Sequence, residues 1–152
     1  MKHEPTFDTA AAHRFFAADC FNRAWELIEK PERTREDDRM MVALNQASIY
    51  HWQQRLDCTD TRLSIGYWQA SRIQALLGNA VEARRHAEVS LAYAADAKPF
   101  YRGYAFEALA RAEAIAGNAA QAAEYAAQAQ AEAERVEEQD KRELLLADVR
   151  SV

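Results

Sequence analysis

Apolar residues recur at helical spacing along almost the whole chain, and short polar links separate the apolar stretches. Side chains three and four positions apart fall on one face of a helix. No alternating run indicates a β-strand, so the pattern predicts an all-α fold with about seven helices, antiparallel in sequence. We expect these helices at about 9–30, 35–56, 62–77, 80–96, 99–116, 119–136 and 138–149.

Local residues support several of these boundaries. Asp8 is suited to cap the first helix, and Thr34 with Asp37 forms the pattern of a capping box before the second. Pro99 is a natural first-turn residue for the fifth helix. The first helix is expected to bury a stripe that includes Phe16 and Cys20.

Two Gly-Asn turns organise the second half of the chain. Gly78 and Gly117 lie 39 positions apart, each between two helical stretches. A glycine just past a helix enters the left-handed region without a steric penalty, so we expect a positive φ at both. Asn79 and Asn118 are expected to cap the next helix through their side-chain oxygens. A two-residue link makes the flanking helices antiparallel.

The stretch 62–136 resembles two tetratricopeptide (TPR) repeats. The matching positions are Tyr67, Ser71, Gly78, Ala83 and Ser90 in the first unit, and Phe106, Leu109, Ala110, Gly117, Ala122 and Ala129 in the second. Ala87 and Ala126 replace the usual aromatic residue of the second helix, no closing proline follows either unit, and the spacing exceeds the usual 34 residues. The resemblance implies a right-handed, TPR-like helical array or superhelix.

Four further stretches resemble a group of uncharacterised bacterial TPR-like proteins, namely 24–31, 48–52, 105–112 and 140–148. The group implies a fold and no assigned activity. We therefore expect a single TPR-like domain over 1–152, with an N-terminal helical pair at 1–61. The two repeat units occupy 62–136, and a capping helix at 137–152 covers the last one.

Composition narrows the classes of function. The 152 residues carry a net charge of −5, which argues against a nucleic-acid partner. Cys20 is expected in the core and Cys58 in a loop, and the two cysteines form no metal or redox motif. No apolar run reaches membrane-spanning length. We expect a cytoplasmic protein with no cofactor, no metal and no membrane partner.

Two groups of polar residues lie in apolar surroundings. His51 falls on the apolar stripe of the second helix beside Trp52, where a structural histidine is favoured over a ligand-binding or catalytic one. Four carboxylates also sit within or beside apolar stretches, Asp19, Glu26, Glu107 and Asp148, and the available partners are Arg72, Arg111 and Arg142. A buried salt-bridge network is the favoured interpretation, although the sequence alone does not pair these residues.

The leading functional hypothesis is a protein–protein interaction or scaffolding module. Stacked helix pairs offer a groove for a peptide or a partner helix. A homodimer is one way to cover that groove. The expected lining comes from the first helix of each unit and consists of Tyr67, Ser71, Gln74, Phe106, Ala110 and Glu113.

The alternative is a small-molecule-binding or enzymatic pocket around His51, Trp52 and Trp68, with Arg72 and Glu107 nearby. The sequence holds no nucleophile elbow, no P-loop and no dinucleotide-binding fingerprint. It names no catalytic residue and favours a non-enzymatic function, leaving the enzymatic one open.

Overall fold

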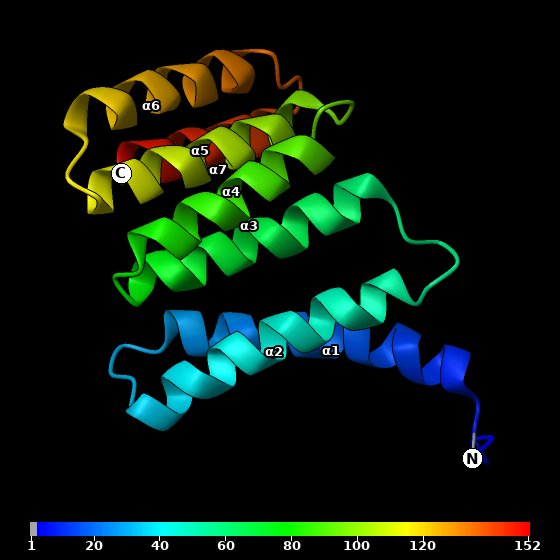
Figure 1. The fold of residues 1–152 in the computed structure, drawn as a ribbon. Helices are drawn as coiled ribbons and strands as arrows, with labels where there is room; N and C mark the ends of the chain where they lie inside the picture. Colours follow the sequence, from blue (N-terminus) through cyan, green and yellow to red (C-terminus); the bar gives the residue numbers. More distant parts are fainter. Residues whose placement is uncertain (1–2) are drawn as a thin grey trace. The chain divides into compact units, whose positions relative to one another are not determined.

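The computed structural model describes residues 3–152, which form seven α-helices and confirm the all-α prediction (Figure 1). By their internal contacts the residues divide into two compact units, one ending at Thr59 and the other running from Asp60 to Val152. The helices are α1 (Thr9–Glu29), α2 (Arg35–Gln53), α3 (Asp60–Leu76), α4 (Ala80–Tyr93), α5 (Pro99–Ile115), α6 (Ala119–Glu134) and α7 (Gln139–Arg150).

The first unit is a pair of helices, α1 and α2, that pack on each other. The Asp8 carboxylate accepts from the backbone N–H of Ala11, and Thr34 and Asp37 form the predicted capping box. Both caps confirm the expected helix starts. The small core that joins the helices consists of Cys20, Ala24, Leu27, Leu44 and Ala47.

The predicted burial of Phe16 on α1 is only partly confirmed. Phe16 is 41% exposed and its neighbour Phe15 is 61% exposed, so neither ring lies in the core. The Phe16 ring instead contacts His51 of α2, with 5.4 Å between the ring centroids. Helical spacing placed Phe16 on the correct side of α1, but the helix pair buries only part of that side.

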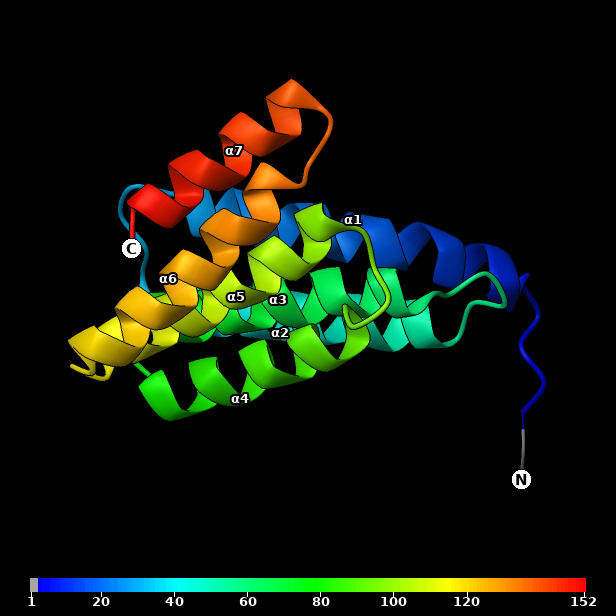
Figure 2. The same ribbon diagram turned by 90° about the horizontal axis from the view of Figure 1, so that it is seen from above.

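The second unit consists of the pairs α3–α4 and α5–α6, with α7 packed on both α5 and α6 (Figure 2). Alanines fill the closest contacts between helices, and Ala83, Ala87 and Ala112 are fully buried. Small side chains let helix backbones approach closely. The helices of each pair therefore lie close together, and larger side chains lie at the edges of their interfaces.

Both Gly-Asn turns end their helices in the same way. Gly78 has a φ of 77° and Gly117 a φ of 83°, as predicted. The N–H of Asn79 donates to the carbonyl of Gln74, and that of Asn118 to the carbonyl of Glu113. These bonds from the second residue past the helix are those of the Schellman motif.

The predicted role of the two asparagine side chains is wrong. Neither Asn79 nor Asn118 accepts a capping hydrogen bond from the helix that it precedes. Their amides donate backwards, to Gln74 at 2.9 Å and to Glu113 at 2.7 Å. The asparagine side chains therefore bond to the last turn of the helix that they follow.

The 39-residue offset found in the sequence recurs in the aromatic contacts. Tyr67 stacks on His86 with 6.1 Å between ring centroids, and Phe106 stacks on Tyr125 with 6.5 Å. Each residue of the second contact is 39 positions after its counterpart in the first. The two helix pairs therefore repeat in their side-chain contacts as well as in their turns.

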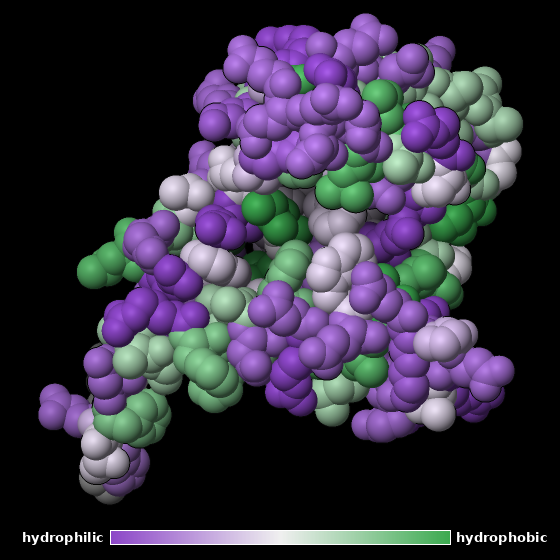
Figure 3. Space-filling view, turned by 180° about the vertical axis from the view of Figure 1, so that it is seen from behind, coloured by the Kyte–Doolittle hydropathy of each residue, from purple (hydrophilic) through white to green (hydrophobic). Residues whose placement is uncertain are grey.

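Hydrophilic side chains cover much of the face shown in Figure 3, and apolar side chains appear there in small groups. Among residues 3–152, no helix combines the length and the apolar character that crossing a membrane would require.

Candidate functional site

A buried carboxylate, Glu107 of α5, is the centre of the candidate site. Its side chain is only 1% exposed. The Trp68 indole N–H of α3 donates to Oε2 at 3.0 Å. The Arg111 guanidinium, one turn further along α5, donates to Oε1 from Nε at 2.8 Å and from a terminal nitrogen at 2.6 Å. Charge-assisted bonds of this kind satisfy a buried carboxylate.

Arg111 also links this carboxylate to the end of the chain. Its guanidinium donates to the Ser151 hydroxyl at 2.9 Å and to the carbonyl of Asp148 at 3.3 Å. The Tyr104 hydroxyl, one turn before Glu107, donates to the Asp148 carboxylate at 2.6 Å. Burial and this acidic partner raise the pKa of Tyr104 well above its usual range. The site thus ties α3, α5 and α7 together.

Arg72 of α3 completes the cluster and is held less firmly. A terminal nitrogen lies 3.7 Å from Oε1 of Glu107, the oxygen that already receives both bonds from Arg111. Its Nε is buried and has no acceptor within residues 3–152. Burial and the neighbouring Arg111 charge lower the pKa of Arg72. We call Trp68, Arg72, Tyr104, Glu107, Arg111 and Asp148 the Glu107 cluster.

A pocket of about 180 Å³ opens beside the two arginines. Arg72, Ala75 and Leu76 line it from α3, and the residues 39 positions later line it from α5. Leu76 and its counterpart Ile115 are each 40% exposed, so both present apolar surface there. The full lining is Arg72, Ala75, Leu76, Arg111, Ala114, Ile115 and Val152, which we call the arginine pocket.

His51 lies in the first unit and is paired with another histidine. Its Nδ1 is 2.8 Å from Nδ1 of His13 on α1, a hydrogen bond in which one ring donates and the other accepts. Burial and the His13 charge lower the pKa of His51. The neighbouring Trp52 ring carries the Arg55 guanidinium 4.0 Å from its centroid. The other members of the alternative pocket, Trp68, Arg72 and Glu107, belong to the second unit.

Two residues expected to line a groove are not surface residues. Ser71 is 1% exposed and donates to the carbonyl of Ala83 on α4 at 2.8 Å, while Ala110 is fully buried. These small side chains allow the first helix of each pair to approach the second. The residues one position later, Arg72 and Arg111, are the ones that line the pocket.

The remaining expected lining residues make contacts within and between helix pairs. Tyr67 stacks on Tyr93 of α4 with 5.8 Å between centroids, and Phe106 packs in the cluster around Leu109. Glu113 pairs with Arg84 of α4, which lowers the pKa of the carboxyl group. Gln74 accepts the bond from Asn79 described above.

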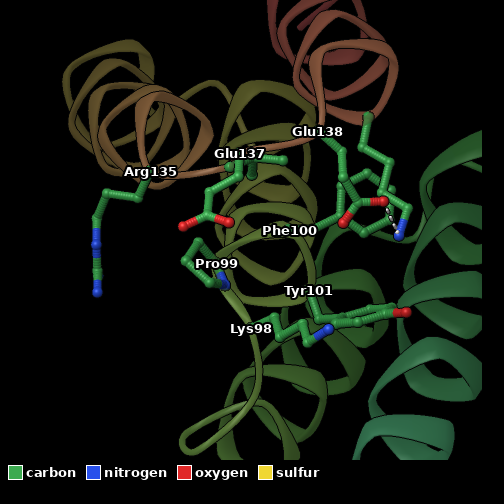
Figure 4. Close-up of a pocket in the computed structure, with 9 residues that line it drawn as sticks. Lys98, Pro99, Phe100, Tyr101, Arg135, Glu137 and Glu138 are labelled. Carbon is green, nitrogen blue, oxygen red and sulfur yellow. Dashed lines mark ion pairs between the residues drawn. The ribbon is translucent and has the colours of Figure 1, made fainter.

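A second pocket, of about 390 Å³, lies between the start of α5 and the link from α6 to α7 (Figure 4). Its charged groups are long side chains on the surface. Glu138 pairs with Lys141 at 2.7 Å, and these side chains are 58% and 43% exposed. Exposed pairs contribute little, so we take the Glu107 cluster and the arginine pocket as the candidate site.

The sequence singled out Arg72, Glu107, Arg111 and Asp148 as charged residues of a possible buried network but left them unpaired, and it assigned Trp68 to the alternative pocket. It did not connect Tyr104 to these residues, and it did not pair His13 with His51. The four-residue spacing from Glu107 to Arg111 was the available signal, since such residues are neighbours on a helix. No local pattern connects His13 to His51, because their contact depends on how α1 and α2 are aligned.

Comparisons of the chain with protein-family models, with curated proteins and with solved structures found no match. Among residues 3–152 no group of three or more His, Cys, Asp or Glu side chains is arranged to hold a metal ion.

Proposed function

We propose that this chain is a TPR-like helical-repeat module that binds a protein or peptide partner at the arginine pocket and along the adjoining first helices, α3 and α5. The observation that carries the proposal is that both helix pairs present an arginine and an aliphatic side chain there. Arg72 and Leu76 of α3 correspond to Arg111 and Ile115 of α5, 39 positions later. Repeat proteins bind through such serially presented surfaces.

This pair of side chains is better suited to binding a peptide than to catalysing a reaction. A guanidinium one helical turn from an aliphatic side chain offers a charged contact beside an apolar one. The groups that would serve catalysis are engaged with one another, because both oxygens of Glu107 already accept hydrogen bonds. These observations support an interaction module over the enzymatic alternative.

Site-specific photo-crosslinking tests the proposal. A photoreactive residue at Leu76 or at Ile115 should capture one and the same partner in the source cell. The matched control is Val81, an apolar residue of α4 that is 69% exposed and lies outside the arginine pocket. Absence of an adduct at Leu76 and Ile115, or an equal adduct at Val81, would contradict the proposed surface.

The mass of the adduct separates two kinds of partner. An adduct of twice the 17.2 kDa chain mass identifies a second copy of this protein. Any other mass identifies a different polypeptide. Replacing Leu76 and Ile115 together by Asp should abolish capture by a crosslinker at neighbouring Ala114 without unfolding the chain, since both side chains are already partly in water.

A further inference from the structure

We propose that the arginine pocket binds a small oxyanion, a phosphate or carboxylate group, which the Arg72 guanidinium holds. The inference does not depend on the partner being a protein, because the anion can belong to a free small molecule or to a larger ligand. Three features of the site carry it: the lack of a close acceptor for Arg72, the different contacts of the two arginines, and the shape of the pocket.

The carboxylate oxygen nearest to Arg72 is already occupied by Arg111. Oε1 of Glu107 receives two hydrogen bonds from Arg111 and is also the oxygen closest to Arg72, at 3.7 Å. Oε2 is occupied by the Trp68 N–H at 3.0 Å. The Asp148 carboxylate accepts from Tyr104. Arg72 is therefore left with a distant ion pair and a buried Nε without an acceptor among residues 3–152.

An added anion would give Arg72 the close acceptor that it lacks. Burial and the Arg111 charge disfavour the charged form of Arg72, whereas the Glu107 and Asp148 charges favour it. An oxyanion in the pocket would supply acceptors to Arg72 and screen the repulsion between the two cations. Planar guanidinium groups bind carboxylate and phosphate oxygens in pairs, which suits this arrangement.

The two arginines differ in their freedom to respond. Arg111 is fixed by Glu107, the Asp148 carbonyl and Ser151. The Arg72 side chain is 25% exposed, and its ion pair with Glu107 is long, at 3.7 Å. Arg111 is thus held in place by its partners, and Arg72 is the guanidinium group that is able to turn toward a ligand.

The pocket fits a small anion with an apolar neighbour. Its volume of about 180 Å³ exceeds several times the roughly 30 Å³ that one water molecule occupies in the liquid. Leu76 and Ile115 at its edge present apolar surface. Partial exclusion of water by such side chains strengthens a charged hydrogen bond.

Nuclear magnetic resonance of the full chain tests the proposal directly. The probes are the arginine Nε–H and tryptophan indole N–H resonances, observed while inorganic phosphate or acetate is added at constant ionic strength. We expect saturable shifts of the Arg72 Nε–H and the Trp68 indole N–H. Saturation with phosphate alone identifies a phosphoryl group, and saturation with acetate identifies a carboxylate.

Matched variants separate binding at Arg72 from a general effect of charge. Arg72→Gln should weaken anion binding at least about tenfold. Arg85→Gln removes the same charge from a 70% exposed position on α4 and should leave binding unchanged. Arg72→Lys keeps the charge and loses the planar guanidinium group, so this variant should bind the anion less tightly than the native chain.

The proposal is overturned if neither anion gives saturable shifts, or if Arg72→Gln binds as tightly as the native protein. We expect Arg72→Gln to fold, because Glu107 keeps its bonds to Arg111 and Trp68. If it does not, Arg72→Lys decides the question: undiminished affinity in that variant contradicts a site built on the guanidinium, and reduced affinity supports it.

Discussion

At the scale of single residues, the buried carboxylate of Glu107 and the partly buried contact between His13 and His51 depend on charge in opposite ways. Glu107 needs its charge, since two arginines and an indole N–H converge on it. The His13–His51 contact needs at least one neutral ring, because a hydrogen bond between the two Nδ1 atoms requires an acceptor. Each contact therefore makes its own prediction.

Replacing Glu107 by Gln should lower the free energy of unfolding by roughly 3–5 kcal/mol, the range typical of a buried ion pair that loses one partner. The amide preserves the shape of the side chain but removes the carboxylate charge that faces Arg111 and Arg72. Urea denaturation measures the loss. Glu82→Gln is the control, since its ion pair with Arg85 lies on the surface and should contribute nothing measurable. Equal effects of the two substitutions would contradict a buried charge network.

Stability should fall as pH decreases below the usual histidine pKa of about 6.5. The pKa of His51 is lowered in the folded chain, so the unfolded chain binds protons more readily in this range. The stabilisation is complete above the unfolded pKa and is lost as pH falls through the folded one. Denaturation of the native chain and of His51→Gln between pH 7.5 and 5 measures the difference.

His86 must be separated from this effect, because burial lowers its pKa as well. The double substitution of His51 and His86 by Gln, compared with His86→Gln alone, isolates the contribution of His51. If these two variants lose stability equally as pH falls, the His13–His51 contact does not titrate as described.

At the scale of helices and turns, local rules predicted most of what the structure shows. The Asp8 cap, the Thr34–Asp37 box and both glycine turns follow from residues within one or two helical turns. The face that each helix presents was harder to predict. Small residues lie on several sides of α3 and α5, so periodicity alone did not distinguish Ser71, which packs on α4, from Arg72, which lines the pocket.

Gly117→Val should destabilise the protein by about 1–2 kcal/mol. An added Cβ would meet nothing within 4 Å, so the expected cost comes from the φ of 83° and not from crowding. The control is Ala116→Val, one position earlier at a φ of −70°. Thermal melts of the two variants should differ, and matching melts would contradict a backbone origin of the cost.

Gly103 of α5 and Leu145 of α7 are complementary in size, which leads to a prediction about their contact. A Cβ added at Gly103 would overlap Cδ2 of Leu145, which is fully buried. Gly103→Ala should therefore displace α7, and Leu145→Ala alone should cost roughly 2–5 kcal/mol through the cavity that it leaves. The double variant should lose less than the two single variants combined. Hydrogen exchange of the α7 amides and urea denaturation provide the measurements, and strict additivity would rule out the contact.

At the scale of the whole molecule, the division at Thr59 separates two units of very different content. The second unit contains the helix pairs α3–α4 and α5–α6, α7 and every member of the Glu107 cluster. The first has two helices and a core of a few small and medium side chains. A chain of about 60 residues buries a smaller fraction of its surface than a longer one and is correspondingly marginal.

The fragment 60–152 should therefore fold by itself. We expect a helical circular dichroism spectrum and a cooperative thermal transition, whereas the fragment 1–59 should show weaker and less cooperative helicity. The indole resonance of Trp68 in the longer fragment reports whether its bond to Glu107 has formed. A longer fragment without a cooperative transition would show that its helices require the first unit.

The hydrogen bond between Trp68 and Glu107 has a consequence for how such a chain could grow. These residues occupy the same position in the helix pairs α3–α4 and α5–α6, with an indole in one and a carboxylate in the other. A tandem duplication of α3–α4 alone would place Trp opposite Trp at the new junction, and duplication of α5–α6 alone would place Glu opposite Glu. Neither junction contains a donor and an acceptor together, so duplicating either helix pair by itself would lose this hydrogen bond at the new junction.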